Sequence, residues 1–130
     1  MDYKAVTKDI LVQVFPSFIA SEYNQKKEEY LFSYEVKITN NSKEDVKLLR
    51  RHWIITDSVG KVSEVKGEGV VGKQPIISVG QTHSYNSYSK LQSPFGTMHG
   101  HYDLYRLDKK ETIEVVIPVF TLETDEVSIN

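Results

Sequence analysis

Alternation of apolar and polar residues in one short segment constrains the fold of this chain more than any other feature. In the segment YLFSYEVKIT, every second side chain from Tyr30 to Ile38 is apolar or aromatic, and those between are mostly polar. A period of two places one set of side chains on each face of a strand. The chain is therefore expected to contain a strand that buries one of its faces.

Further strand patterns occur at short intervals, separated by residues that favour turns. Residues 9–16 predict an earlier strand, in which Pro16 indicates an edge position or the end of the strand because proline has no amide hydrogen. Residues 46–56 predict another strand, after the turn-forming segment 40–45. Additional short strands are expected at residues 61–65, 83–85, 97–107 and 112–118. This spacing predicts an all-β antiparallel sandwich of about seven to eight strands.

The length of the chain suits a single domain. Its 130 residues, of which 39% are hydrophobic, supply enough apolar material for one core. We expect one domain over residues 1–130, with a core from about residue 7 to residue 122. Residues 21–29 have a helix-like composition but almost no apolar residue that could dock a helix, so a mobile loop is expected there.

Composition excludes several classes of site and partner. The chain has no cysteine, which rules out disulfides, thiolate zinc sites, iron–sulfur clusters and cysteine nucleophiles. The formal net charge of -2 gives no general attraction to nucleic acid or anionic lipid, so no nucleic-acid partner is expected. No apolar run approaches the ~20 residues of a membrane span, and the N-terminus has no secretory signal pattern. We therefore expect a soluble, cytoplasmic protein.

No segment carries the pattern of an active site. The serines do not lie in a G-x-S-x-G elbow, and the paired carboxylates lie in polar turns that are expected to be open to solvent. We expect no catalytic residue, no enzyme activity and no cofactor.

The first candidate site is a glycine-rich segment in which Gly67, Gly69 and Gly72 match the G-x-G-x-x-G pattern of dinucleotide-binding folds. That pattern requires a helix directly after the glycines, because the helix amides and dipole hold the phosphate. Here Pro75 and β-branched residues follow, so we reject the dinucleotide interpretation. Two interpretations remain open. The glycines provide a connection between the two sheets with positive backbone φ, or their bare amides bind an anion with help from Lys73 and nearby arginines.

The second candidate site is a run of guanidinium and aromatic groups: Arg50, Arg51, His52 and Trp53. Such groups are typical of a recognition patch for a partner protein or an acidic ligand. In the alternative, the sole tryptophan lies in the core, with Arg51 on the same side of the strand. Because a regular strand would then bury a charge, we expect a bulge near Leu49 and Arg50. A buried arginine would also need an acidic partner, for which Asp57 and Glu64 are the candidates.

The third candidate site is a metal site. His99, His101 and Asp103 occupy alternate positions, so a strand would project two imidazoles and a carboxylate from one face, and these groups are metal ligands. The alternative is the polar, solvated face of an ordinary strand.

Four tyrosines cluster in the second half of the chain, namely Tyr85, Tyr88, Tyr102 and Tyr105. Most are expected in the core or at its rim. If several were exposed together on one sheet, they would mark a protein contact, including a symmetric dimer.

Three segments of the chain resemble the motifs of the bacterial ApaG family, also called CorD. They are LLRRHWIITD at residues 48–57, GEGVVGKQP at residues 67–75 and SPFGTMHGHY at residues 93–102. The resemblance implies an immunoglobulin-like or fibronectin type III-like sandwich and an association with cobalt resistance and magnesium efflux. The glycines belong to the family pattern, whereas His99 and His101 occupy positions that the pattern leaves open.

The leading hypothesis is a non-enzymatic domain that binds another protein through one sheet face and the loops around residues 50–53 and 67–72. Related domains in some eukaryotic proteins look like protein-interaction modules, and analogy of fold points the same way. The rival hypothesis is a sensor or carrier of a phosphorylated or nucleotide-like anion, or of a divalent metal, at the glycine-rich loop.

Overall fold

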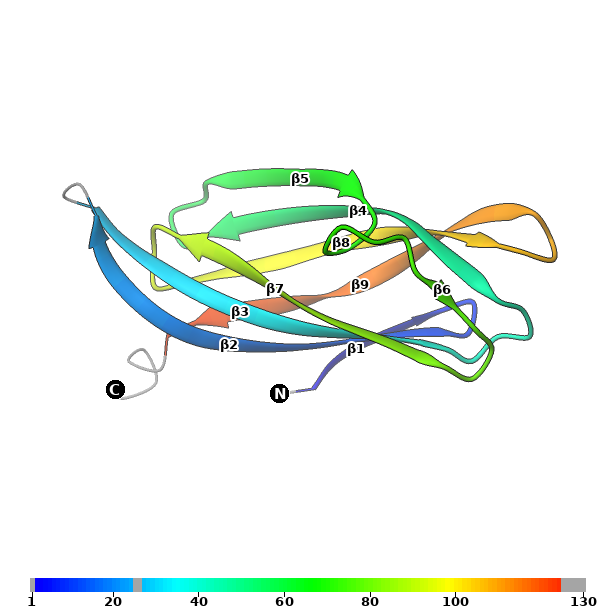
Figure 1. The fold of residues 1–130 in the computed structure, drawn as a ribbon. Coiled ribbons are helices and arrows are strands. Elements are labelled where there is room, and N and C mark those ends of the chain that lie inside the picture. The colour runs from blue at the N-terminus through cyan, green and yellow to red at the C-terminus, as the bar shows by residue number, and fades with distance from the viewer. Residues whose placement is uncertain (1, 25–26, 125–130) are drawn as a thin grey trace.

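Strands are the regular elements of the computed structural model, which describes residues 2–24 and 27–124 (Figure 1). In chain order they are β1 (Tyr3–Thr7), β2 (Ile10–Asn24), β3 (Lys27–Asn40), β4 (Val46–Asp57), β5 (Val62–Glu68), β6 (Ile76–Ile77), β7 (Thr82–Leu91), β8 (Phe95–Arg106) and β9 (Glu111–Glu123). The expected all-β class is confirmed. The number of strands in these ranges exceeds the expected seven to eight because β1 and the two-residue β6 were not among the predicted segments. Within the same ranges no helix is long and apolar enough to cross a membrane.

The strands form two antiparallel sheets that pack face to face as an immunoglobulin-like sandwich, as expected. One sheet has the order β1-β2-β3-β7, and the other has the order β5-β4-β8-β9, with β6 also paired to β4. One side of the sandwich is closed because β9 contacts both β1 and β2, and the Val116 amide donates a hydrogen bond to Thr7 Oγ1 over 3.1 Å. On the opposite side the edge strands are β5 and β7 (Figure 1).

The core lies between the sheets and follows the predicted alternation. Every second residue of β3 from Phe32 to Ile38 is buried, as the period of two required. These side chains meet a cluster of aromatic rings, in which Trp53 is only 3% exposed. Its ring centroid lies 5.4 Å from that of Tyr34 and 5.9 Å from that of Phe120. The interpretation of Trp53 as a core residue is confirmed.

The predicted loop at residues 21–29 is wrong. Ser21 pairs with Tyr30 and Tyr23 pairs with Glu28, so the ends of β2 and β3 form a two-stranded ribbon; residues 25–26 lie outside the described residues. Backbone hydrogen bonds between the strands hold such a ribbon without a buried face, which is why the segment needs no apolar side chains. The expected edge position of Pro16 is confirmed, because the pairing of β2 with β1 ends at Val14.

A buried polar cluster joins the turn after β3 to the turn between β8 and β9. The Glu44 carboxylate, in a residue only 6% exposed, accepts hydrogen bonds from the Lys109 and Asp108 amides and from the Arg106 guanidinium, all over 3.1–3.2 Å. The Lys109 amide, together with the other two donors, holds the pKa of the Glu44 carboxyl below its ordinary value despite the opposing effect of burial.

Replacing Glu44 by glutamine is expected to destabilise the fold near neutral pH and to flatten the acid side of its stability profile. A carboxyl with a lowered folded-state pKa stabilises the fold above its unfolded pKa of 4.5, and loses that contribution as the pH falls through the folded value. Urea denaturation of Glu44→Gln and the parent, from neutral pH to below this value, measures both effects. Glu28→Gln on the exposed ribbon is the control. An acid-side slope that matches the parent in Glu44→Gln would contradict the prediction.

Candidate binding cleft

A bulge in β4 determines which way the residues of the second candidate site point. The pairing of β4 with β8 shifts register between Leu48 and Arg50, as the sequence predicted. Beyond the bulge, Arg51 and Trp53 face the space between the sheets, whereas Arg50 is exposed on the outer face. The run 50–53 is therefore divided between two faces of the sheet.

The guanidinium of Arg51 lies beside Gly67 of the neighbouring strand β5. Its Nη1 donates hydrogen bonds to the carbonyl oxygens of Glu68, over 3.1 Å, and Gly69, over 2.9 Å. A Cβ placed on Gly67 would lie 2.7 Å from each terminal guanidinium nitrogen. The absence of a side chain at Gly67 therefore provides the space that this guanidinium occupies.

The acidic partner expected for Arg51 is not found among residues 2–24 and 27–124, so that prediction was wrong. The Asp57 carboxylate accepts hydrogen bonds from two backbone amides of the turn that follows β4. The Glu64 carboxylate lies 3.2 Å from the ammonium of Lys66. Backbone carbonyls at the end of β5 take the place of a carboxylate.

The glycine-rich segment closes a tight turn at the edge of β4. Val70 and Lys73 exchange backbone hydrogen bonds over 2.8 and 3.0 Å, and the two residues between them have positive φ, 48° at Val71 and 75° at Gly72. Positive φ at both central positions is the mark of a type I′ turn. We call residues 69–73 the glycine turn.

The glycine turn joins β5 to β6, and both of these strands pair with β4. The expectation that the glycines connect the two sheets is therefore wrong, because the chain crosses to the first sheet only after β6. The predicted positive φ is found at Gly69 and Gly72 but not at Gly67. No helix follows Gly72 in the described part of the chain, which confirms the rejection of the dinucleotide interpretation.

The backbone amides of the glycine turn are largely occupied. The amide of Gly69 donates to the Leu49 carbonyl over 2.9 Å, and those of Val70 and Lys73 donate to each other's carbonyls. An anion-binding nest needs neighbouring amides that are free to converge on the ligand. The geometry therefore gives little support to an anion held by this backbone.

A cleft follows the open edge of the sandwich, between β5 with the glycine turn on one side and β7 on the other; we call it the edge cleft. Its central cavity has a volume of about 310 Å³ and is lined by Arg51, Trp53, Tyr34, Val71 and Tyr88, among others. An adjoining cavity of about 130 Å³ shares all of these residues except Val71 and extends to Val65 of β5.

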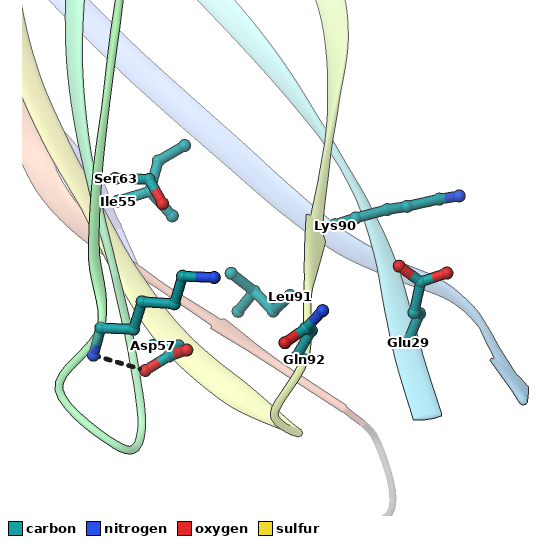
Figure 2. A pocket seen from close by; sticks show the side chains of 8 residues that line it. Glu29, Ile55, Asp57, Ser63, Lys90, Leu91 and Gln92 are labelled. Carbon is teal, nitrogen blue, oxygen red and sulfur yellow. Dashed lines mark hydrogen bonds between the residues drawn. The ribbon is translucent and has the colours of Figure 1, made fainter. Parts of the chain in front are cut away.

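The edge cleft continues toward the turn between β4 and β5. Figure 2 shows this end, a cavity of about 170 Å³ with Ile55 and Ser63 on one side and Leu91 on the other. Ile55 also lines the adjoining cavity, so the two hollows are neighbours along this edge of the sandwich. The side chains of Lys61 and Lys90 line this end as well.

The charge of Arg51 is not neutralised by the hydroxyl groups around it. Burial raises the pKa of the Tyr34, Tyr85 and Tyr102 hydroxyls, and those of Tyr85 and Tyr102 share a hydrogen bond. These groups therefore stay uncharged at physiological pH. The edge cleft combines a cation with neutral aromatic and hydroxyl groups.

The remaining sequence-predicted residues lie elsewhere. His52 belongs to the outer face, where its Nε2 lies 3.2 Å from the Glu64 carboxylate. Lys73 is exposed on the glycine turn. His99 lies where β8 and β9 shift register, apart from the group formed by His101 and Asp103. Sequence reasoning did not bring the tyrosines of the first sheet together with Arg51, because no local pattern shows which strands face each other.

The tyrosine cluster of the second half does not form an exposed patch. Tyr85 and Tyr102 are buried and Tyr105 is partly buried, so Tyr88 alone among the four is exposed, at 64%. A symmetric dimer stays a prediction.

The sequence of this chain matches that of a known protein family. A sequence profile of the ApaG domain matches residues 20–106. The chain belongs to the ApaG family. Protein ApaG of Methylobacterium sp. (strain 4-46) is 44% identical over 125 residues, which cover 96% of this chain and 95% of that protein. Protein ApaG of Rhizobium leguminosarum bv. trifolii (strain WSM2304) is 43% identical over 122 residues, 94% of this chain and 93% of that protein. The resemblance seen in the three motifs is confirmed.

Solved structures share the ApaG fold. The crystal structure of the putative ApaA protein from Bordetella pertussis matches with a TM-score of 0.83 and 39% identity, and covers 90% of this chain and 94% of that one. An X-ray structure of a Northeast Structural Genomics Consortium target matches with a TM-score of 0.89 and 38% identity, over 94% of this chain and 92% of that one. The two-sheet arrangement is therefore that of ApaG relatives.

Proposed function

We propose that this ApaG-family chain is a binding domain without a catalytic centre, and that its edge cleft takes up an acidic, extended segment of another protein. The observation that carries this proposal is the inward-facing guanidinium of Arg51, which no carboxylate of the described residues balances. A partly buried charge is costly without a counter-charge. A carboxylate from a partner supplies that counter-charge.

The hydrogen bonds already made by Arg51 leave a defined set of donors for such a partner. Within the described chain, Nη1 is the nitrogen of the Arg51 guanidinium that donates hydrogen bonds. Nε and Nη2 therefore remain for the two oxygens of a carboxylate, in the paired geometry that makes arginine a specific carboxylate receptor.

The edge strands favour an extended partner. In the described sheets β5 pairs only with β4 and β7 pairs only with β3, so each has one unpaired row of backbone groups along the cleft. An extended peptide can add to such an edge and place alternate side chains into the neighbouring cavities. Val65 and Tyr88, 40% and 64% exposed, offer apolar and aromatic surface at the rim.

The rival role, binding of a phosphorylated or nucleotide-like anion at the glycine turn, has weaker support because most of the turn's amides are occupied. The association with cobalt resistance and magnesium efflux stays a prediction about the pathway.

A peptide selection tests the proposed function. Random peptides displayed on phage are selected against the immobilised protein, and enriched peptides are titrated while the fluorescence of Trp53, which lines the cleft, is followed. We expect enrichment of peptides with aspartate or glutamate. Arg51→Met is expected to weaken binding about tenfold or more, because a hydrogen bond to a charged group is lost.

Two matched variants make this test specific. Gly67→Ala keeps the charge but displaces the guanidinium, because the three atoms nearest the new Cβ belong to the flexible end of Arg51. It should weaken binding as Arg51→Met does. Arg50→Met removes the same charge from the outer face and should bind as the parent does. Selection without acidic enrichment, or equal affinity in Arg51→Met, would overturn the proposal. Thermal stabilisation by pyrophosphate or ATP without any bound peptide would favour the rival.

Relieving the backbone strain of the glycine turn is expected to raise the stability of the fold without raising its affinity for peptide. Val71 is β-branched and 64% exposed, yet it adopts φ of 48°, a conformation rare for such residues. Val71→Asn creates the Asn-Gly pair that type I′ turns favour, and should stabilise the fold by about 1 kcal/mol. Thermal unfolding measures this gain, and Val79→Asn, exposed outside the turn, is the control. If Val71 contacts the partner, peptide affinity falls while stability rises; an unchanged or lower melting temperature contradicts the strain argument.

A further inference from the structure

The outer face of the second sheet carries a group of side chains that lies apart from the edge cleft. His101 and Asp103 project from β8, and Glu114 projects from the neighbouring strand β9. One nitrogen or oxygen atom from each lies within 4.8 Å of the others. His101 Nε2 is 3.2 Å from Glu114 Oε1 and 3.8 Å from Asp103 Oδ1.

These distances suit a shared metal ion. Zinc binds histidine nitrogen and carboxylate oxygen at about 2.0–2.2 Å, so two ligands of one tetrahedral ion lie roughly 3.4 Å apart. The observed separations of 3.2 and 3.8 Å lie on either side of this value. The third separation, between the Asp103 and Glu114 carboxylates, is within 4.8 Å, so these two side chains close on an ion by rotating toward each other.

The strand register places two carboxylates side by side at this point. Asp103 and Glu114 are directly opposite each other in the antiparallel pair of β8 and β9. Like charges directly opposite on neighbouring strands are destabilising. A cation between the two carboxylates converts this repulsion into attraction.

Arg50 holds the Asp103 carboxylate in the required orientation. Its Nε donates a hydrogen bond to Asp103 Oδ2 over 3.3 Å. The other oxygen, Oδ1, is the one that faces His101. Partners of this kind, outside the ligand set, orient the ligands of metal sites.

We infer that His101, Asp103 and Glu114 form a binding site for a divalent transition metal ion on the outer face of the sheet. The donor set of one imidazole and two carboxylates favours zinc, cobalt or nickel over magnesium, which prefers oxygen ligands and retains its water. The site is open to solvent, because the Glu114 side chain is 67% exposed, so water completes the coordination. Glu114 replaces His99 in the ligand set suggested by the sequence.

The competing explanation is an ion-pair cluster in which a protonated His101 balances both carboxylates. Calorimetric titration of the untagged chain with zinc, nickel and cobalt(II) chloride distinguishes the two. We expect one ion per chain, with no heat from magnesium. His101→Ala and Glu114→Gln are expected to weaken binding about tenfold or more, by comparison with the effects of losing even an outer-shell group. His99→Ala is the matched control and should bind as the parent does.

A spectroscopic measurement on the unmodified chain keeps the test independent of how well the variants fold. Zinc should shift the imidazole NMR signals of His101 and leave those of His83, on β7 of the other sheet, unchanged. Absence of heat above background with all three ions would overturn the inference. So would parent-like titration by folded His101→Ala, or loss of binding in His99→Ala.

Discussion

Replacing Gly100 by alanine is expected to remove a large part of the free energy of unfolding of this protein. A Cβ at this position would lie 1.9 Å from the carbonyl oxygen of His52 and 3.1 Å from the Cα of Trp53. Both atoms belong to the backbone of β4, which pairs with β8 here, so neither can rotate away as a side chain could. The strands would have to separate in the middle of the second sheet. We expect a loss on the order of 4 kcal/mol or more, against a total stability of about 5–15 kcal/mol for a domain.

Urea denaturation monitored by the fluorescence of the sole tryptophan measures this loss. Gly60→Ala is the matched control: its Cβ meets no atom within 4 Å, although φ there is 87°. That variant carries only the cost of a left-handed alanine, about 1–2 kcal/mol. If Gly100→Ala were as stable as Gly60→Ala, close strand approach at Gly100 would not limit the fold.

The second large effect is expected from truncation of Trp53 to alanine. The indole lies at the centre of the core, with ring centroids of Tyr34, Phe120 and Tyr102 at 5.4, 5.9 and 6.3 Å. Removing it leaves a cavity that β-sheet backbones on both sides cannot fill. The free energy of unfolding should fall by about 3–5 kcal/mol, the usual range for large aromatic residues in a core.

Circular dichroism must follow the unfolding of Trp53→Ala, because this variant lacks the tryptophan. Trp53→Phe keeps a ring among the same neighbours and should lose clearly less stability. Equal losses in the two variants would mean that the aromatic cluster contributes little beyond its apolar area.

The sequence predicts this fold wherever one face of a strand is buried. The alternation from Tyr30 to Ile38 identified β3 because its inward side chains meet the core. The same rule failed at residues 21–29, where the ribbon of β2 and β3 buries no face and so leaves no periodic signal. The strand predicted at residues 112–118 also ends too early, because β9 continues past Pro118. This proline lies at the register shift between β8 and β9, where a missing amide hydrogen is tolerated.

The candidate sites could be predicted where they depend on which face of a strand each side chain points from. Alternation around Trp53 required Arg51 to face inward and a bulge to precede it, and both are found. The carbonyl partners of Arg51 were not predictable, because they depend on where β5 ends. The position of Glu114 could have been predicted from the sequence. In the hairpin of β8 and β9, Arg106 is opposite Glu111, so moving three residues away from the turn on each strand places Glu114 opposite Asp103.

The unequal closure of the sandwich has a consequence for its motions. β5 is paired along one edge only and exposes nearly all of its side chains, whereas β9 contacts β1 and β2 across the closed side. Local opening requires least free energy where few apolar contacts are lost. Amide protons of β5 should therefore exchange with solvent deuterium well before those of β8, which has a paired strand on each side. A molecule seated against β5 would slow that exchange, so this weakly held strand also reports whether the cleft is occupied.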